Sequence, residues 1–169
     1  IGKETFFLFD ENHECYDQVD YASGDIFNTE FNLEPRLAAM YQLNEFSSIK
    51  ASYGRTVQYA QLASNASAGI PFDMWFPTSP NIKPQKCDQF SIGYFRNFLN
   101  NEIETSVEFF YKNIHNVIDF ADNATLIGNL YIDGEVRAGK GYAYGAEFLL
   151  RKNFGDFSGW ISYTYSKSM

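Results

Sequence analysis

Aromatic and acidic side chains gather in two stretches of the sequence that contain turn residues and lack regular periodicity, residues 59–86 and 119–141. Aromatic rings can stack on a bound molecule, and carboxylates can orient it. This combination predicts ligand binding. The candidate ligand-binding residues are Phe72, Asp73, Trp75 and Phe76 in the first stretch, and Asp119, Asp122, Tyr131 and Asp133 in the second. The alternative is that Trp75 and its neighbours pack their own loop together.

No arrangement of residues in the sequence predicts catalysis. His13 and His115 are isolated, and a single histidine is more often a surface or core residue than a ligand. The serines lie within strand patterns and lack the GxSxG motif of hydrolases. Glu104 and Glu108 share one strand face, where lining a wet interior or pairing with cations on neighbouring strands explains them better than acid-base chemistry. We therefore expect neither an enzyme nor a bound cofactor.

Acidic residues near the N-terminus and the two cysteines are the remaining candidates for metal ligands or a cross-link. A calcium loop needs regularly spaced oxygen ligands, and the acidic stretch near the N-terminus lacks that spacing, so no metal site is predicted. The acidic residues concerned are Asp10, Glu14, Asp17 and Asp20. Cys15 and Cys87 match no metal-binding spacing, but they could form one disulfide in an oxidising compartment.

The net charge of −8 comes almost entirely from the beginning of the chain. Residues 1–30 hold eight acidic residues and one lysine, and the rest of the chain is nearly balanced. An acidic surface repels phosphate backbones, so a nucleic acid partner is not expected. Residues 1–30 are interpreted as a large, acidic, exposed loop region.

Apolar and polar residues alternate through most of residues 31–169, which predicts an all-β fold of about six antiparallel strands. Side chains in a strand point alternately to opposite faces, so Phe109 would lie on an apolar face and Glu108 on a charged one. Arg55 departs from this pattern because it falls on the apolar face of its strand. We expect either a bulge in that strand or a side chain that reaches toward water.

The apolar strand faces need a partner, which could be a second protein sheet or lipid. Aromatic residues make up 18% of the chain, a composition that suits both strands and membrane interfaces. No run approaches the roughly 20 apolar residues of a spanning helix, whereas barrel strands are only half apolar. A soluble all-β module that binds a ligand or carbohydrate therefore stays open beside a membrane barrel.

The expected connections alternate in length along the chain. In an up-and-down sheet alternate connections lie at the same end, so the short ones would gather at one rim and the long ones at the other. Outer-membrane barrels have this asymmetry, with tight periplasmic turns and long extracellular loops. The short connections are expected near residues 44–48, 100–101 and 153–156, and the long ones near 59–86 and 119–141.

Several strings in residues 31–169 add a family resemblance. The sequence 81–85 (NIKPQ) is similar to a step that precedes a strand, and 143–147 (AYGAE) is similar to a strand motif, in TonB-dependent outer-membrane receptors. Taken in order, the strings resemble the C-terminal half of the barrel in these receptors, particularly those of Bacteroidetes type. The strings are NLEPRLAAMYQLN, SIKASYGRTVQY, NIKPQKCDQFSIGYFRNF, VEFFYKNIHNVIDF and GYAYGAEFLLRKNFGDFSGWISYTYSKS.

The resemblance implies a 22-stranded transmembrane barrel with a plug, in the outer membrane of a Gram-negative bacterium and in contact with its lipid. It implies import of a scarce nutrient such as an iron chelate, cobalamin or a glycan, driven by the TonB complex through an N-terminal segment. The plug, that segment and the closing strand are missing from this sequence, so we expect a fragment. Residues 1–30 would then be extracellular, and 31–169 would form a partial barrel.

Overall fold

The computed structural model describes residues 4–10, 14–22, 24–26, 28–64, 73–122, 124–125, 128–129 and 131–169. This part of the chain consists of ten β-strands and one short 3₁₀ turn, η1 (Ile132–Glu135). No helix in it is long and apolar enough to cross a membrane. The chain divides into two compact units. Unit 1 comprises Ile1–Asn32, Val57–Lys86 and His115–Lys140, and unit 2 comprises Leu33–Thr56, Cys87–Ile114 and Gly141–Met169.

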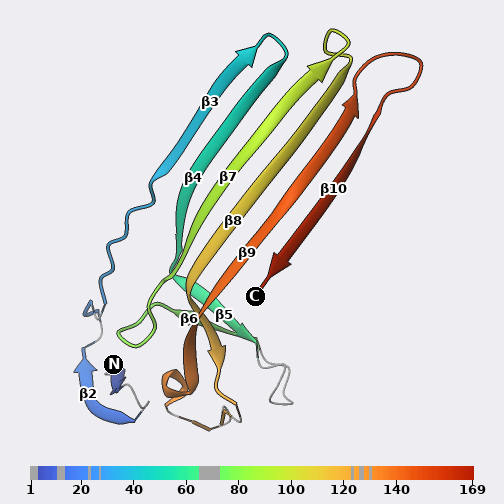
Figure 1. Ribbon diagram of the computed structural model, residues 1–169. Coiled ribbons are helices and arrows are strands. Elements are labelled where there is room, and N and C mark those ends of the chain that lie inside the picture. The colour runs from blue at the N-terminus through green and yellow to red at the C-terminus, as the bar shows by residue number, and fades with distance from the viewer. Residues whose placement is uncertain are drawn as a thin grey trace. The chain divides into compact units, whose positions relative to one another are not determined.

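The largest sheet has six strands in the order β3, β4, β7, β8, β9 and β10 (Figure 1). Strand directions alternate, and neighbouring strands follow one another along the chain. The exception is the step from β4 to β7, where the chain first forms a hairpin of β5 (Ala60–Ser64) and β6 (Asp73–Pro77). This confirms the predicted antiparallel, all-β fold. The strands are β3 (Arg36–Asn44), β4 (Ser47–Gln58), β7 (Gln85–Phe98), β8 (Ile103–Phe120), β9 (Val136–Lys152) and β10 (Gly159–Ser168).

A tight turn at residues 99–102 joins β7 to β8. Asn100 and Asn101 have positive φ angles of 50° and 70°, and the Glu102 N–H donates to the Leu99 carbonyl at 3.1 Å. Positive φ at both central residues defines a type I′ turn, whose twist matches that of the flanking strands. Asparagine is well suited to these positions because it tolerates left-handed backbone angles better than most residues.

Cross-strand pairing places apolar residues opposite apolar residues on one face of the sheet. Leu37 of β3 pairs with Tyr53 of β4, and Phe148 of β9 pairs with Tyr163 of β10. Since the side-chain period of a strand is two, the intervening residues point to the other face. The predicted division into an apolar and a polar face therefore follows directly from the observed register.

Unit 1 contains two hairpins of its own. Strands β1 (Glu4–Phe9) and β2 (Cys15–Tyr21) pair antiparallel within the stretch expected to be a loop. The Thr5 hydroxyl donates to the carboxylate of its cross-strand partner Asp20 at 2.7 Å. Strands β5 (Ala60–Ser64) and β6 (Asp73–Pro77) pair within the first long connection. Both stretches are long enough to satisfy part of their backbone hydrogen bonding internally.

The buried apolar core of the described chain lies in unit 1. Phe76 and Phe120 meet edge to face with ring centroids 5.7 Å apart. The core residues are Ala63, Phe76, Ile82, Ile118, Phe120 and Val136, and Met74, Ala124 and Ile132 pack against them. Unit 2 contributes no apolar residue to this set, so its strands are not held by a second protein layer among the described residues.

Candidate functional site

The apolar face of the six-stranded sheet is exposed. Leu37 is 69% exposed, Tyr163 63% and Phe148 43%. Rings on this face contact each other across strands, with centroid separations of 4.8 Å for Tyr53 and Phe90 and 6.5 Å for Phe148 and Tyr163. Soluble monomers rarely expose a contiguous apolar surface of this extent. Lipid is the partner that fits it, because a soluble sandwich would require a second sheet over these side chains.

Charged residues lie at both ends of the apolar face. On β7, Asp88 and Arg96 fall on the same face eight residues apart, with Phe90, Ile92 and Tyr94 between them. At about 3.3 Å per residue, this separation is about 26 Å along the strand. A strand tilt of about 40° reduces it to about 20 Å across a membrane, close to the apolar band of about 25 Å in transmembrane barrels.

Arg55 is paired with a carboxylate on the neighbouring strand. Its Nε and Nη2 donate to the two Asp88 oxygens at 2.8 and 3.0 Å, and the Tyr53 hydroxyl donates to the same carboxylate at 2.6 Å. The pairing of β3 with β4 is continuous from Arg36 and Gly54 to Gln42 and Ser48, and its register shifts between Gln42 and Asn44. A bidentate ion pair with Asp88 thus neutralises the arginine on the apolar face, and the sequence did not predict this partner.

The opposite face of the sheet is polar and is crossed by side-chain contacts. The hydroxyls of Ser52 and Ser91 lie 2.7 Å apart, and the Lys50 ammonium lies 4.2 Å from the centroid of the Phe95 ring. These residues alternate with the apolar ones along β4 and β7. A sheet with one lipid-compatible face and one polar face is the arrangement found in the wall of a water-lined barrel.

The two glutamates of β8 also lie on this polar face. Glu104 pairs with Arg151 of β9 at 4.0 Å and accepts a hydrogen bond from Asn153 Nδ2 at 2.8 Å. The pairing across strands that was expected for Glu104 is therefore observed. The Glu108 side chain covers Gly93, because a Cβ atom built on that glycine would lie 2.7 Å from Glu108 Cγ.

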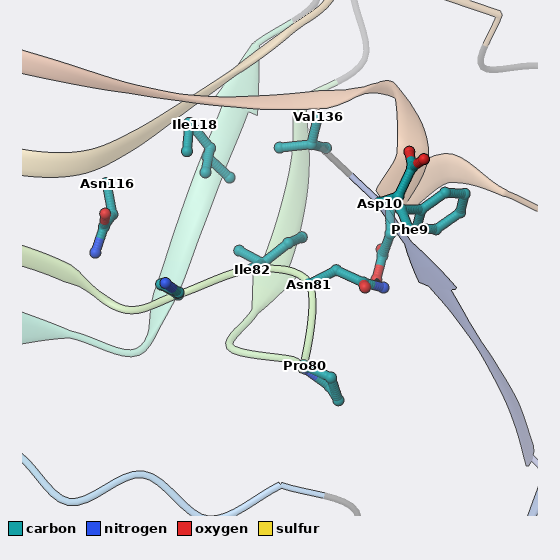
Figure 2. Close-up of a pocket in the computed structure, with 11 residues that line it drawn as sticks. Phe9, Asp10, Pro80, Asn81, Ile82, Asn116, Ile118 and Val136 are labelled. Carbon is teal, nitrogen blue, oxygen red and sulfur yellow. Dashed lines mark hydrogen bonds between the residues drawn. The ribbon is translucent and has the colours of Figure 1, made fainter. Parts of the chain in front are cut away.

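A cavity of about 320 Å³ lies within unit 1 (Figure 2). Figure 2 shows Ile82, Ile118 and Val136 pointing toward one another, with Asn81 on one side and Asn116 on the other. The polar residues that line the cavity are Asp10, Asn81, Lys83, Asn116 and Asp133. Their amide, carboxylate and ammonium groups can orient a small polar ligand above an apolar floor.

Asp133 is fixed by a turn that is far from it in sequence. Its Oδ2 accepts hydrogen bonds from Ser79 Oγ and Asn81 Nδ2, each at 3.4 Å, and Asn81 Nδ2 also donates to the Phe7 carbonyl at 2.7 Å. The turn itself is closed by reciprocal backbone bonds between Ser79 and Ile82 at 3.0 and 3.2 Å. Three segments of the sequence therefore meet at the Asn81 amide, which bonds both Phe7 and Asp133.

Asn116 lies within β8 and has a left-handed backbone conformation. Its φ angle is 57°, and its Nδ2 donates to the Pro84 carbonyl at 2.9 Å. Non-glycine residues with positive φ are uncommon in strands and often occur where a side chain is redirected toward a functional site. Here the redirected amide lines the cavity.

The predicted binding residues of the first long connection have different surroundings. Phe72 lies outside the described residues, and Asp73 is the first residue of β6. Trp75 is 64% exposed beside its cross-strand partner Leu62, whereas Phe76 is buried in the core. The alternation of β6 thus turns Trp75 outward and Phe76 inward. Phe76 packs with Ala63 of the same connection, as the alternative expected of the neighbours of Trp75.

The predicted residues of the second long connection are only partly brought together. Asp119 and Asp122 are exposed, and Asp119 Oδ1 accepts a hydrogen bond from the next backbone N–H at 2.8 Å. Tyr131 meets Phe7 edge to face with ring centroids 4.6 Å apart. Asp133 lines the cavity described above.

Four other polar residues of the cavity were not among the predicted binding residues: Asp10, Asn81, Lys83 and Asn116. The Asn81–Pro84 segment carries a turn signal, since asparagine and proline are frequent in turns. That signal predicts a turn but not the side chains that the turn faces. Asn116 lies in a regular strand pattern and gives no sign of its left-handed backbone.

Cys15 lies in β2 of unit 1, and Cys87 lies in β7 of unit 2. Cys15 and Cys87 are both free thiols. Asp10 Oδ1 accepts a hydrogen bond from the Glu14 N–H at 2.8 Å. In the part of the chain that the structure describes, no three His, Cys, Asp or Glu side chains converge to hold a metal ion.

A six-stranded antiparallel meander with an exposed apolar face of membrane-spanning height and a polar opposite face defines part of the wall of a transmembrane β-barrel. The family model described as TonB dependent receptor-like, beta-barrel matches residues 16–169, and the chain belongs to this family. The chain is thus a β-barrel part of an outer-membrane receptor. Comparisons with curated proteins and with solved structures found no match.

Proposed function

We propose that this chain forms part of the C-terminal half of the barrel in a TonB-dependent receptor of Bacteroidetes type, in a Gram-negative bacterium. The receptor imports a scarce nutrient, such as an iron chelate, cobalamin or a glycan, and is not an enzyme. The exposed apolar face of the six-stranded meander carries this proposal, because it requires lipid rather than protein as its neighbour.

The complete barrel in this proposal has 22 strands, the size of large plugged outer-membrane transporters. Strands β3 and β10 lie at the two edges of the sheet, and every residue in them is exposed. Unpaired strand edges are not tolerated in a bilayer, where backbone groups find no water to bond. The remaining strands of the receptor would pair with these two edges.

Ligand capture is assigned to the extracellular connections. An exposed aromatic ring at Trp75 and carboxylates at Asp119, Asp122 and Asp133 are suited to stacking on a ligand and orienting it. Phe72, Asp73 and Tyr131 belong to the same connections and complete the proposed set, whereas the buried Phe76 supports them from the core. In this scheme the ligand enters the polar interior after capture, and the TonB complex supplies the energy.

Uptake measurements in the source bacterium test this function. Strains lacking either the receptor or TonB should take up one nutrient class at least ten-fold more slowly than the parent strain. The probes are a labelled ferric chelate, cyanocobalamin and labelled oligosaccharides, with a receptor restored on a plasmid as the control. Unchanged uptake of all three classes in the receptor deletion, or recovery of the receptor from the soluble fraction, would contradict the proposal.

A further inference from the structure

We propose that the cavity of unit 1 binds a sugar residue, which makes a neutral glycan the substrate class of the receptor. This inference rests on the proposed function and narrows it. The cavity volume of about 320 Å³ is at the lower end of the range of about 300 to 1,000 Å³ for small-molecule sites. It suits one or two sugar rings better than a cobalamin.

Hydrogen-bond acceptors dominate the polar part of the cavity. Among the described residues, none donates to Asp133 Oδ1, Asn81 Oδ1 or Asn116 Oδ1, although each of these side chains is held by a bond through its other atoms. Lys83 adds an ammonium donor. Sugar hydroxyls both donate and accept, so a ring with several hydroxyls can use three acceptors and one donor together.

The apolar part of the cavity matches the other surface of a sugar ring. Ile82, Ile118 and Val136 are buried and point toward one another, and the Phe9 side chain also lines the cavity (Figure 2). A pyranose has C–H groups on its faces and hydroxyls at its rim. Its faces can therefore contact these side chains while its rim meets the polar groups.

The polar groups are held in place before a ligand arrives. Ser79 and Asn81 fix the orientation of Asp133, and the bond to the Pro84 carbonyl fixes Asn116. Gly134 lets the Phe9 ring approach η1, because a Cβ atom at that glycine would lie 2.7 Å from the ring. Preorganised groups lose less conformational freedom when a ligand binds.

The net charge of unit 1 favours a neutral glycan over an anionic chelate as the ligand. Unit 1 contains 13 acidic and five basic residues, whereas unit 2 contains eight of each, so unit 1 carries the whole net charge of −8. A field of this sign lowers the local concentration of anionic ligands near the cavity. A neutral sugar is not repelled, and one of its hydroxyls can donate a charge-assisted hydrogen bond to the Asp133 carboxylate.

Calorimetric titration of the intact receptor in detergent tests the inference. The probes are maltohexaose, cellohexaose and xylohexaose, with ferric citrate and cyanocobalamin as the competing classes. At least one neutral oligosaccharide should bind, and Asp133→Asn or Asn116→Gly should weaken it by ten-fold or more. Glycine is chosen at position 116 because it keeps the left-handed backbone. Asp156→Asn removes an exposed carboxylate between β9 and β10, outside the cavity, and should change affinity less than two-fold.

The folded state of each variant is checked by its heat-modifiable migration in gel electrophoresis. The sugar site would be overturned if none of the three oligosaccharides bound. It would also be overturned if ferric citrate or cyanocobalamin bound and Asp133→Asn weakened that binding. TonB-dependent uptake of a chelate or of cobalamin would support the transporter function but exclude a glycan as the substrate class. Loss of TonB-dependent uptake for every class would instead count against the transporter function itself.

Discussion

Arg55 and Asp88 form a charged pair on the lipid-compatible face, and removing one partner should cost more than removing both. Arg55→Leu or Asp88→Leu leaves an unpaired charge on an apolar surface, whereas the double variant leaves none. We expect each single variant to lower the free energy of unfolding more than the double variant does. Urea unfolding of the receptor in lipid vesicles measures this difference.

A second arginine provides the control for that comparison. Arg36 pairs with Glu34 at 3.6 Å on a more exposed surface. Exposed pairs contribute about 0 to 1 kcal/mol, so Arg36→Leu should change stability little. An equal loss of stability from the variants of Arg36 and Arg55 would show that the position on the apolar face has no special cost.

At the scale of the elements, the turn at residues 99–102 depends on residues that accept positive φ. Asn101→Val should reduce stability by about 1 to 3 kcal/mol, because a β-branched residue is strained at a φ of 70°. Asn101→Gly should be tolerated, since glycine adopts such angles freely. Thermal unfolding of the two variants under the same conditions compares them, and equal melting temperatures would contradict the type I′ assignment.

The close approach of β9 to its neighbours depends on Gly145. A Cβ atom there would lie 2.5 Å from the Tyr165 carbonyl and 2.8 Å from the Phe110 ring. Gly145→Ala should therefore lower stability by about 1 to 3 kcal/mol, the usual cost of overpacking. Gly159→Ala is the matched control, because no atom lies within 4 Å of the corresponding position. Denaturant titration should separate the two variants, and similar losses would show that crowding at Gly145 is not limiting.

At the scale of the whole molecule, the two faces of the sheet should respond differently to charge. Ala39 and Ala38 are adjacent in β3, both are exposed, and they point to the apolar and polar faces respectively. Ala39→Arg should destabilise the receptor in lipid by about 2 to 4 kcal/mol, the cost of a cation facing the middle of a bilayer. Ala38→Arg faces the wet interior and should cost far less.

Folding titrations of the two arginine variants into lipid vesicles give the comparison directly. The same change one residue apart controls for side-chain size and for strand propensity. If Ala38→Arg were the more damaging of the two, the apolar face would not be the lipid face. A soluble sandwich would instead show comparable behaviour in plain buffer, without any need for lipid.

The division of the chain into faces could be predicted from the sequence, because the alternation of strand side chains is a local property. Phe109 and Glu108 illustrate this, as does the turn at Asn100 and Asn101, whose residue type matches its backbone angles. The exposed position of Trp75 beside the buried Phe76 follows the same local rule. The rule of alternating side chains applies to β6 as well, but the sequence of the long connection did not predict a strand there.

The sequence alone therefore determined which side chains share a face and where the chain can turn tightly, since both depend on neighbouring residues. Only the tertiary structure decided that Asp88 neutralises Arg55, and that Asn81, Asn116 and Asp133 line one cavity. Those contacts join residues that are distant in the chain, so they depend on strand register and on the packing of the core. Periodicity carries no information about such long-range neighbours.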